Sequence, residues 1–408
     1  MLEQQPMSPQ TFPRTSSPSD TGGPTDPLSA VSHPSPYPYY AGLAEGPGIF
    51  LDSKNSVWVA SRSVVIQEIV SHPACRVRPV AEPVPKALAG SAAGDIFRRL
   101  VRMNDGAGHC PFKQAISASL QSLSLADMEQ QGSIWSRHLA ELHFDAEDDG
   151  WLDRFAVQMP VYVVASLLGV PQSELPETAI LMQDFVACLA PGCNEQQLER
   201  GKLAAAKLLE NFSGMQEREN PGLLLQLRRQ AALLGCEDPT VIAANGIGLM
   251  SQAYEATAGL IANTLYVLAG DAPLRRQILA DADLLRACID EVLRYDPSVQ
   301  NTRRFVAEDC EIAGQVLQAG DTILLVLAAA NRDPSVNSQP QLFELQRSQR
   351  RYFTFGHGAH LCPGPSLAAV IAHAAIHQLC SMDLNFERLA TARKFHPSAN
   401  IRMRLYGA

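Results

Sequence analysis

Residues 355–368 read FGHGAHLCPGPSLA and surround Cys362 with three glycines. Glycine allows a backbone to approach a flat ligand closely and to curl around one sulfur. The four residues from Pro365 open an apolar helical pattern, so the thiol is expected just before a helix N-terminus. The helix dipole and the free N–H groups there favour a thiolate. This stretch singles out Cys362 among nine cysteines that otherwise stand alone.

Three interpretations of this cysteine are open on the residues alone. The first is a buried, inert thiol in a glycine-rich turn, as most single cysteines are. The second is a zinc site made by Cys362 with His357 and His360, whose close spacing would be cramped and which lacks a fourth ligand nearby. The third is an axial thiolate for haem iron, which needs one cysteine, a close glycine loop and cations for the propionates.

Upstream, residues 241–270 carry one charge, Glu255. As a helix this segment would span about 45 Å, the width of a domain. Several polar residues argue against a membrane span and favour a helix buried through the protein centre. A buried carboxylate needs a partner or a proton, so Glu255 is either a satisfied core acid or a proton relay beside a cavity. The helix alone does not separate these two roles.

The stretch EVLRYDP places Glu291 and Arg294 three residues apart, on one face of a helix that ends at Asp296-Pro297. By itself this is an ordinary exposed ion pair of little energetic value. It is followed by a strand-like run over residues 316–330 and then by Asn331-Arg332-Asp333-Pro334.

Together these stretches resemble the cytochrome P450 family. FGHGAHLCPG matches its haem-binding signature F-x-x-G-x-x-x-C-x-G, and EVLR is similar to its E-x-x-R pair. ANRDP is similar to the segment after its sheet, and LMSQAYEATAGL to its oxygen-activating helix. The resemblance implies a mainly α fold with small β-sheets (α+β), namely a triangular helical body with a long central helix over the haem.

The resemblance also implies a cofactor site for haem b (iron protoporphyrin IX). Cys362 would be the axial thiolate ligand of the iron, held in its loop by the buried structural pair Glu291 and Arg294. The other residues expected to contact the cofactor or its propionates are His109, Lys113, Arg304, Phe355, His360 and Gly364. Where this chain has HCPFK, the family more often has H-x-x-x-R. Lysine keeps the charge but loses the bidentate fork of arginine.

The central helix departs from the family pattern. Members usually have an acid followed by Thr, whereas this chain has Glu255-Ala256-Thr257, preceded by Gln252-Ala253 in place of Ala-Gly. A macrolide-hydroxylating branch has a similar acid–Ala step, where a substrate hydroxyl helps to hold the water. We therefore expect Glu255 to relay protons. The missing hydroxyl or amide would be supplied by Thr257, Gln252 or the substrate. A one-residue shift of the alignment would make Thr257 the relay group.

The residues after Cys362 are Pro363, Gly364 and Pro365. Thiolate ligands are tuned by N–H donors from neighbouring residues, and proline has no N–H. Two donors are therefore missing, which should leave a more strongly donating sulfur and a lower iron reduction potential. The alternative is that Pro365 merely starts the next helix, where proline is favoured.

The implied function is that of a monooxygenase, which inserts one atom of O2 into an apolar small organic substrate. A separate ferredoxin and ferredoxin reductase would supply two electrons. The alternatives are an H2O2-driven peroxygenase and a non-catalytic haem-binding protein. The expected substrate pocket includes Met250, Ala253, Val299, Gln300 and Asn301. Ahead of the cysteine loop, a basic docking surface for the ferredoxin is expected at Arg347, Arg350 and Arg351, unless these arginines form an ordinary solvated face.

Composition bounds the remaining questions. The chain has 408 residues, of which 46% are hydrophobic and 18% charged, so most of it should fold. A net charge of −9 argues against nucleic acid as a partner. No signal peptide, membrane anchor or CxxC pair is evident, which favours a cytoplasmic protein, expected to be a monomer. Residues 1–36 are rich in Pro and Ser and are expected to be disordered, with one catalytic domain over residues 37–408.

Overall fold

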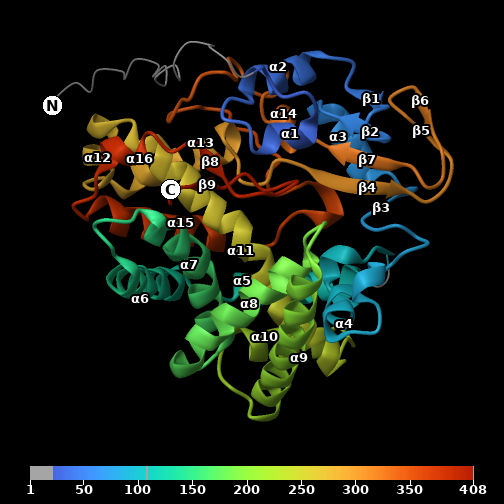
Figure 1. The fold of residues 1–408 in the computed structure, drawn as a ribbon. Coiled ribbons are helices and arrows are strands. Elements are labelled where there is room, and N and C mark those ends of the chain that lie inside the picture. The colour runs from blue at the N-terminus through green and yellow to red at the C-terminus, as the bar shows by residue number, and fades with distance from the viewer. Residues whose placement is uncertain (1–21, 107–108, 408) are drawn as a thin grey trace.

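The computed structural model describes residues 22–106 and 109–407, and most of them lie in helices (Figure 1). The helices are α1 (Pro27–Val31), α2 (Tyr37–Glu45), α3 (Ser63–Ser71), α4 (Ala92–Arg99), α5 (Cys110–Gln121), α6 (Leu125–His143), α7 (Gly150–Leu168), α8 (Leu175–Leu189), α9 (Glu195–Glu217), α10 (Leu223–Leu233), α11 (Pro239–Ala269), α12 (Ala272–Ile278), α13 (Ala282–Tyr295), α14 (Leu327–Ala330), α15 (Pro365–Cys380) and α16 (Phe386–Leu389). The strands are β1 (Ile49–Asp52), β2 (Val57–Ala60), β3 (Cys75–Arg76), β4 (Thr302–Val306), β5 (Cys310–Ile312), β6 (Gln315–Leu317), β7 (Thr322–Leu325), β8 (Lys394–Phe395) and β9 (Arg404–Leu405). The predicted class, mainly α with small sheets, is confirmed.

The long helix α11 runs through the middle of the helical body, where it is drawn in yellow (Figure 1). Its first residue is Pro239, after Asp238, whose side chain accepts a hydrogen bond from the Thr240 N–H. Polar side chains inside the helix have specific partners. Asn245 Oδ1, for example, accepts from the Val101 N–H at 2.8 Å. These bonds explain how a nearly uncharged helix can carry polar residues in a protein interior.

None of the helices within the described ranges is long and apolar enough to cross a membrane.

A five-stranded sheet lies at one end of the helical body, with strand order β1-β2-β7-β4-β3 (Figure 1). Strands β2 and β7 pair in parallel, and the other neighbours are antiparallel. The run over residues 316–330 is not one strand, because Gly320 has φ 98° in the turn between β6 and β7. Its last four residues form α14. The hairpin β8–β9 stands apart from this sheet, with Phe395 opposite Arg404.

The expectation that residues 1–36 are disordered is wrong for part of that range. Helix α1 begins after Asp26, which caps it, and its residues Ala30 and Val31 are fully buried. The Arg402 guanidinium donates to the Val31 carbonyl at 2.9 Å, which ties this helix to the C-terminal part of the chain. Pro27 is the first residue of this helix and Ser29 completes a capping box with Asp26, so a composition typical of disordered segments misled the prediction. Residues 1–21 lie outside the described residues.

Candidate active site

The cysteine loop is closed at its base by backbone hydrogen bonds. The Cys362 N–H donates to the Phe355 carbonyl at 2.8 Å, across a turn in which Gly356 and Gly358 have φ 76° and 66°. Side chains rarely adopt this left-handed region, which explains why glycine occupies both positions. The loop leads directly into α15, whose first residue is Pro365.

The sulfur of Cys362 accepts one hydrogen bond from the described residues, from the Gly364 N–H at 3.4 Å. Burial raises the pKa of the Cys362 thiol, while the Gly364 N–H and the charge of Lys113 oppose that rise. The position before a helix therefore does not by itself yield a thiolate. A metal cation bound to the sulfur would deprotonate it. The loop is thus better suited to a metal ligand than to a free reactive thiol.

The cationic side chains expected at the propionates gather beside this loop. Lys113 donates from Nζ to the Leu361 carbonyl, immediately before Cys362. The rings of His109 and His360 lie 4.3 Å apart between centroids, and Arg304 is buried on β4. Burial, with the charges of His360 and Lys113, lowers the pKa of His109 to about 4, and burial also lowers the pKa of Lys113. A neighbouring anion would relieve this cost.

His109, Lys113, Arg304 and His360 are here named the positive cluster. One acid, Asp105, contacts this cluster and was not predicted. Its Oδ1 lies 3.1 Å from His360 Nε2, and its Oδ2 accepts from the Val77 N–H. Burial opposes ionisation of Asp105, but these hydrogen bonds and the nearby cations hold its pKa below the usual range. No pattern in the sequence pairs Asp105 with a residue 255 positions away.

These residues fit a haem. One carboxylate stands against two histidines, a lysine and an arginine, so the cluster can accept the two carboxylates of a porphyrin. Leu361, next to the sulfur, is 48% exposed, which leaves an apolar surface that a flat ring would cover. The zinc interpretation finds no support, because no group of three metal-binding side chains occurs in the described part of the chain.

Helix α11 has a strip of accessible residues at mid-length. Between residues 242 and 265, the only residues that are not buried are Leu249, 251–253, 255 and 256, here named the accessible strip. Gln252 is exposed on this strip, and its Nε2 donates to the Gly248 carbonyl at 2.9 Å. Ala256 lies on the strip, whereas Thr257 is buried. The helix therefore turns Thr257 away from the surface that Gln252 and Ala256 share.

Glu255 also lies on the accessible strip and has a partner that was not predicted. Its Oε1 is 3.2 Å from His396 Nε2, just after strand β8. The two side chains are 27% and 36% exposed. Glu255 is therefore neither a satisfied core acid nor a free carboxylate, but a partly solvated member of a Glu–His pair.

The expected substrate-pocket residues differ in placement. Ala253 is on the accessible strip, whereas Met250 is fully buried in the main core. Residues 299–301 pair with the C-terminal segment: the Gln300 N–H donates to the Asn400 carbonyl, and Asn301 Nδ2 donates to the Ala399 carbonyl. These contacts fasten the C-terminal segment beside the site. The Gln300 side chain donates from Nε2 to the Pro297 carbonyl, and its buried Oε1 has no hydrogen-bond partner among the described residues.

Glu291 and Arg294 form a fully buried pair, with 2.6 Å between Oε1 and Nη2. Arg350 Nε approaches Glu291 at 2.9 Å, and Arg347 Nε at 3.4 Å. Burial opposes ionisation of Glu291, but Arg294, the Glu344 N–H and the charge of Arg347 hold its pKa below the usual range. The expected docking surface is therefore wrong for Arg347 and Arg350, which turn inward because a buried carboxylate needs compensating charge. Of the three arginines, only Arg351 is exposed.

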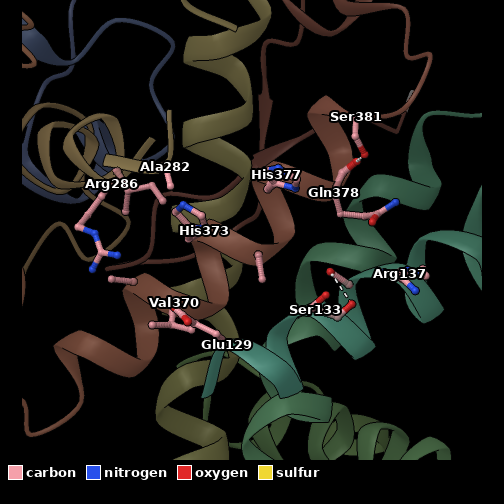
Figure 2. A pocket seen from close by; sticks show the side chains of 14 residues that line it. Glu129, Ser133, Arg137, Ala282, Arg286, Val370, His373, His377, Gln378 and Ser381 are labelled. Carbon is pink, nitrogen blue, oxygen red and sulfur yellow. Dashed lines mark hydrogen bonds between the residues drawn. The ribbon is translucent and has the colours of Figure 1, made fainter. Parts of the chain in front are cut away.

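A separate pocket of about 400 Å³ lies between α6, α13 and α15 (Figure 2). His373 and His377 line it from α15, with their rings stacked at 6.5 Å between centroids. Arg137 and Arg286 line it from α6 and α13. None of its lining residues belongs to the predicted site.

Comparison with known proteins agrees with this geometry. The Cytochrome P450 family model matches residues 243–382. A 20-oxo-5-O-mycaminosyltylactone 23-monooxygenase from Streptomyces fradiae is 26% identical over 350 residues, covering 85% of this chain and 80% of that protein. The biotin biosynthesis cytochrome P450 of Bacillus subtilis (strain 168) is 29% identical, covering 55% of this chain. The match spans only 58% of that relative, less than two thirds of its length.

Solved structures share the fold. The crystal structure of P450BioI in complex with hexadec-9Z-enoic acid ligated acyl carrier protein has a TM-score of 0.75 at 22% identity, covering 91% of this chain and 96% of that one. CalO2 gives the same TM-score and identity over 93% and 96%. These matches show that the chain shares the fold of the cytochrome P450 structures and that residues 243–382, which include Glu255, the Glu291–Arg294 pair and the cysteine loop, match the cytochrome P450 family model.

Proposed function

We propose that the chain inserts one oxygen atom of O2 into an apolar small organic substrate, in the balanced reaction RH + O2 + 2 e⁻ + 2 H⁺ → ROH + H2O. The observation that carries the proposal is the Cys362 sulfur, held in a closed glycine loop beside a cluster of basic side chains. The cofactor implied by the family, a haem with a thiolate ligand, supplies the oxygen and electron chemistry when bound.

The chain's own residues would hold that cofactor and control its surroundings. In this proposal Cys362 Sγ is the iron ligand, and the Gly364 N–H donates to it. Lys113, Arg304 and the two histidines of the positive cluster bind the carboxylates. Phe355 closes the loop through its carbonyl. Glu291 supports the segment before the loop, because it accepts a hydrogen bond from the Glu344 N–H.

The reaction consumes two protons, and Glu255 is the acid proposed to hold and move them. Ala256 cannot supply a hydroxyl, and Thr257 is buried away from the accessible strip. Gln252 is exposed on the strip and its Nε2 is already engaged, so its amide oxygen is available to a water. We therefore assign the missing polar group to Gln252 or to a hydroxyl of the substrate. The substitution Gln252→Leu separates these two possibilities. If Gln252 supplies the polar group, less product should form per electron pair in the variant. If the substrate hydroxyl supplies it, the yield should stay unchanged.

The oxidant and the electron donor are tested together. The proposal expects product from O2 with NADPH and a surrogate ferredoxin and ferredoxin reductase, and ¹⁸O from labelled O2 in that product. Peroxide-driven turnover is the second candidate, because Ala256 replaces the usual Thr. Product formed with H2O2 alone, and none with O2 and the electron donors, would replace the monooxygenase proposal with a peroxygenase. Haem binding without product under either condition would leave the non-catalytic alternative.

The substrate class is proposed as apolar. Ala253 and Ala256 give the accessible strip small side chains. The relative from Streptomyces fradiae is named for a mycaminosyltylactone, and P450BioI was crystallised with a fatty-acyl carrier protein. A lactone and an acyl chain both present apolar carbon. Titration of the haem-loaded protein with compounds of both kinds, followed by the spin state of the haem iron, would show which kind binds at this site.

A further inference from the structure

The Glu255–His396 pair assigns a role to a histidine that no motif marks. We propose that His396 is a positioning residue that passes protons from solvent to Glu255. This inference rests on the proposed monooxygenase function, because that reaction consumes two protons per turnover.

The fold holds the two partners together. His396 follows β8, and its N–H donates to the Met403 carbonyl at 2.9 Å, so the hairpin β8–β9 fixes its backbone. The segment after the hairpin turn is fastened to α11, because Asn263 Nδ2 donates to the Arg402 carbonyl at 3.0 Å. A Cβ on Gly259 would lie 2.9 Å from the same carbonyl oxygen. The contact between His396 and Glu255 is therefore set by close packing of the hairpin on the helix.

The surroundings of the two side chains give the path a direction, because His396 lies on the hairpin and Glu255 on the accessible strip of α11. His396 is 36% exposed and can exchange protons with water, while Glu255 lies on the accessible strip beside Gln252 and Ala256. In the proposed step the Nε2–H bond of the His396 imidazolium breaks and an O–H bond forms on Glu255 Oε1. The neutral imidazole then takes a proton from solvent. No oxidant or reductant is needed, and charge is conserved at each transfer.

The other charged and titratable groups near the pair leave this role to the histidine. Tyr254 precedes Glu255, and burial together with the charges of Glu255 and Asp184 raises its pKa, so it stays protonated. Asp184 on α8 pairs with Arg200 at 3.3 Å. On the hairpin, Arg404 stacks on the Tyr266 and Phe395 rings, and Lys394 is exposed. Histidine is the residue type among these that ionises near neutral pH.

The variants that test the proposal are His396→Ala and His396→Gln in the haem-loaded full chain. Glutamine can still donate a hydrogen bond to Glu255 but cannot carry a proton. Lys394→Ala on the same hairpin is the matched control. We measure product formed per electron pair, H2O2 released and the solvent isotope effect on electron consumption. Removal of a proton-transfer group commonly costs about 10²-fold or more, so both His396 variants should lose coupling by about ten-fold or more. The control should not.

Wild-type coupling in His396→Gln would overturn the relay, because a hydrogen bond alone would then suffice. A second measurement needs no turnover: the NMR chemical shift of His396 Nε2 is compared in the wild type and in Glu255→Ala. The proposal expects this resonance to move in the variant, because Nε2 loses the carboxylate that lies 3.2 Å away in the wild type. An unchanged resonance would show that the two side chains do not interact and would overturn the inference. Failure of the proposed function would be seen separately, as wild-type protein that forms no product from O2 with the electron donors.

Discussion

Replacing Pro363 or Pro365 with alanine should raise the reduction potential of the haem iron in this protein. Each substitution restores an N–H close to the Cys362 sulfur, which has one donor among the described residues, Gly364 at 3.4 Å. Reduction adds negative charge to the iron–sulfur unit. An added N–H donor therefore stabilises the reduced form more than the oxidised form.

The size of the effect follows from the strength of such bonds. A hydrogen bond to a charged group is worth about 1.5–3 kcal/mol, and we assign roughly half of it, about 1 kcal/mol, to the difference between the two oxidation states. A tenfold change corresponds to about 1.4 kcal/mol and, for one electron, to about 59 mV. Each alanine should thus raise the potential by about 40 mV, and the double variant by about 80 mV if the bonds are independent.

The assay is spectroelectrochemical titration of the substrate-free protein. Pro239→Ala is the matched control, because Pro239 begins α11 as Pro365 begins α15, but α11 does not follow the cysteine loop. The control separates loss of a helix-start residue from gain of a donor. If both loop variants keep the wild-type potential while still binding haem through the thiolate, the electronic role of the prolines is refuted.

Three further substitutions test the packing and charge of the site. Glu291→Gln leaves buried arginines without their carboxylate and should lower the free energy of unfolding by about 3–5 kcal/mol, measured by urea titration; a loss as small as that of the half-buried neighbour Asp290→Asn would contradict the account. The folded-state pKa of His109, about 4, lies below its unfolded value near 6.5, so the protein without haem should keep full stability above pH 6.5 and lose up to about 3 kcal/mol as the pH falls toward 4. His109→Gln should remove that dependence, and an identical pH profile in the variant would exclude His109 as its cause. Gly259→Ala places a methyl group 2.8 Å from Ser298 Cβ and should cost about 1–3 kcal/mol in a urea titration, whereas an unchanged midpoint would mean that the C-terminal segment shifts freely.

The sequence contained enough to predict the parts of the site that are local in the chain. The glycine loop around Cys362, the long helix around Glu255 and the spacing of Glu291 and Arg294 each depend on residues within one element. Their periodicity, glycine positions and helix-start residues are visible without a structure.

The parts that escaped prediction depend on contacts between distant segments. His396 reaches Glu255 only because a hairpin near the C-terminus packs on α11. Arg347 and Arg350 looked like a surface cluster, since nothing in the run of arginines shows that a buried Glu291 lies against them. Whether a charged side chain faces the interior or the surface depends on where its counter-charge lies in the folded structure, and the local sequence does not show this.

The N-terminal error has a different cause. Pro27 and Asp26 begin a short helix, but the same residue types are typical of disordered segments, so composition over 36 residues could not separate the two. The deciding contact is the Arg402 guanidinium on the Val31 carbonyl, far away in the chain.

The most direct test of the central claim is the absorption spectrum of the dithionite-reduced, haem-loaded protein with and without carbon monoxide. We expect a Soret band at the position that gives the cytochrome P450 family its name, and loss of that band in Cys362→Ser. A band at shorter wavelength in the wild type would show a protonated or displaced thiolate. That result, or the absence of any haem band, would contradict the assignment of Cys362 as the iron ligand.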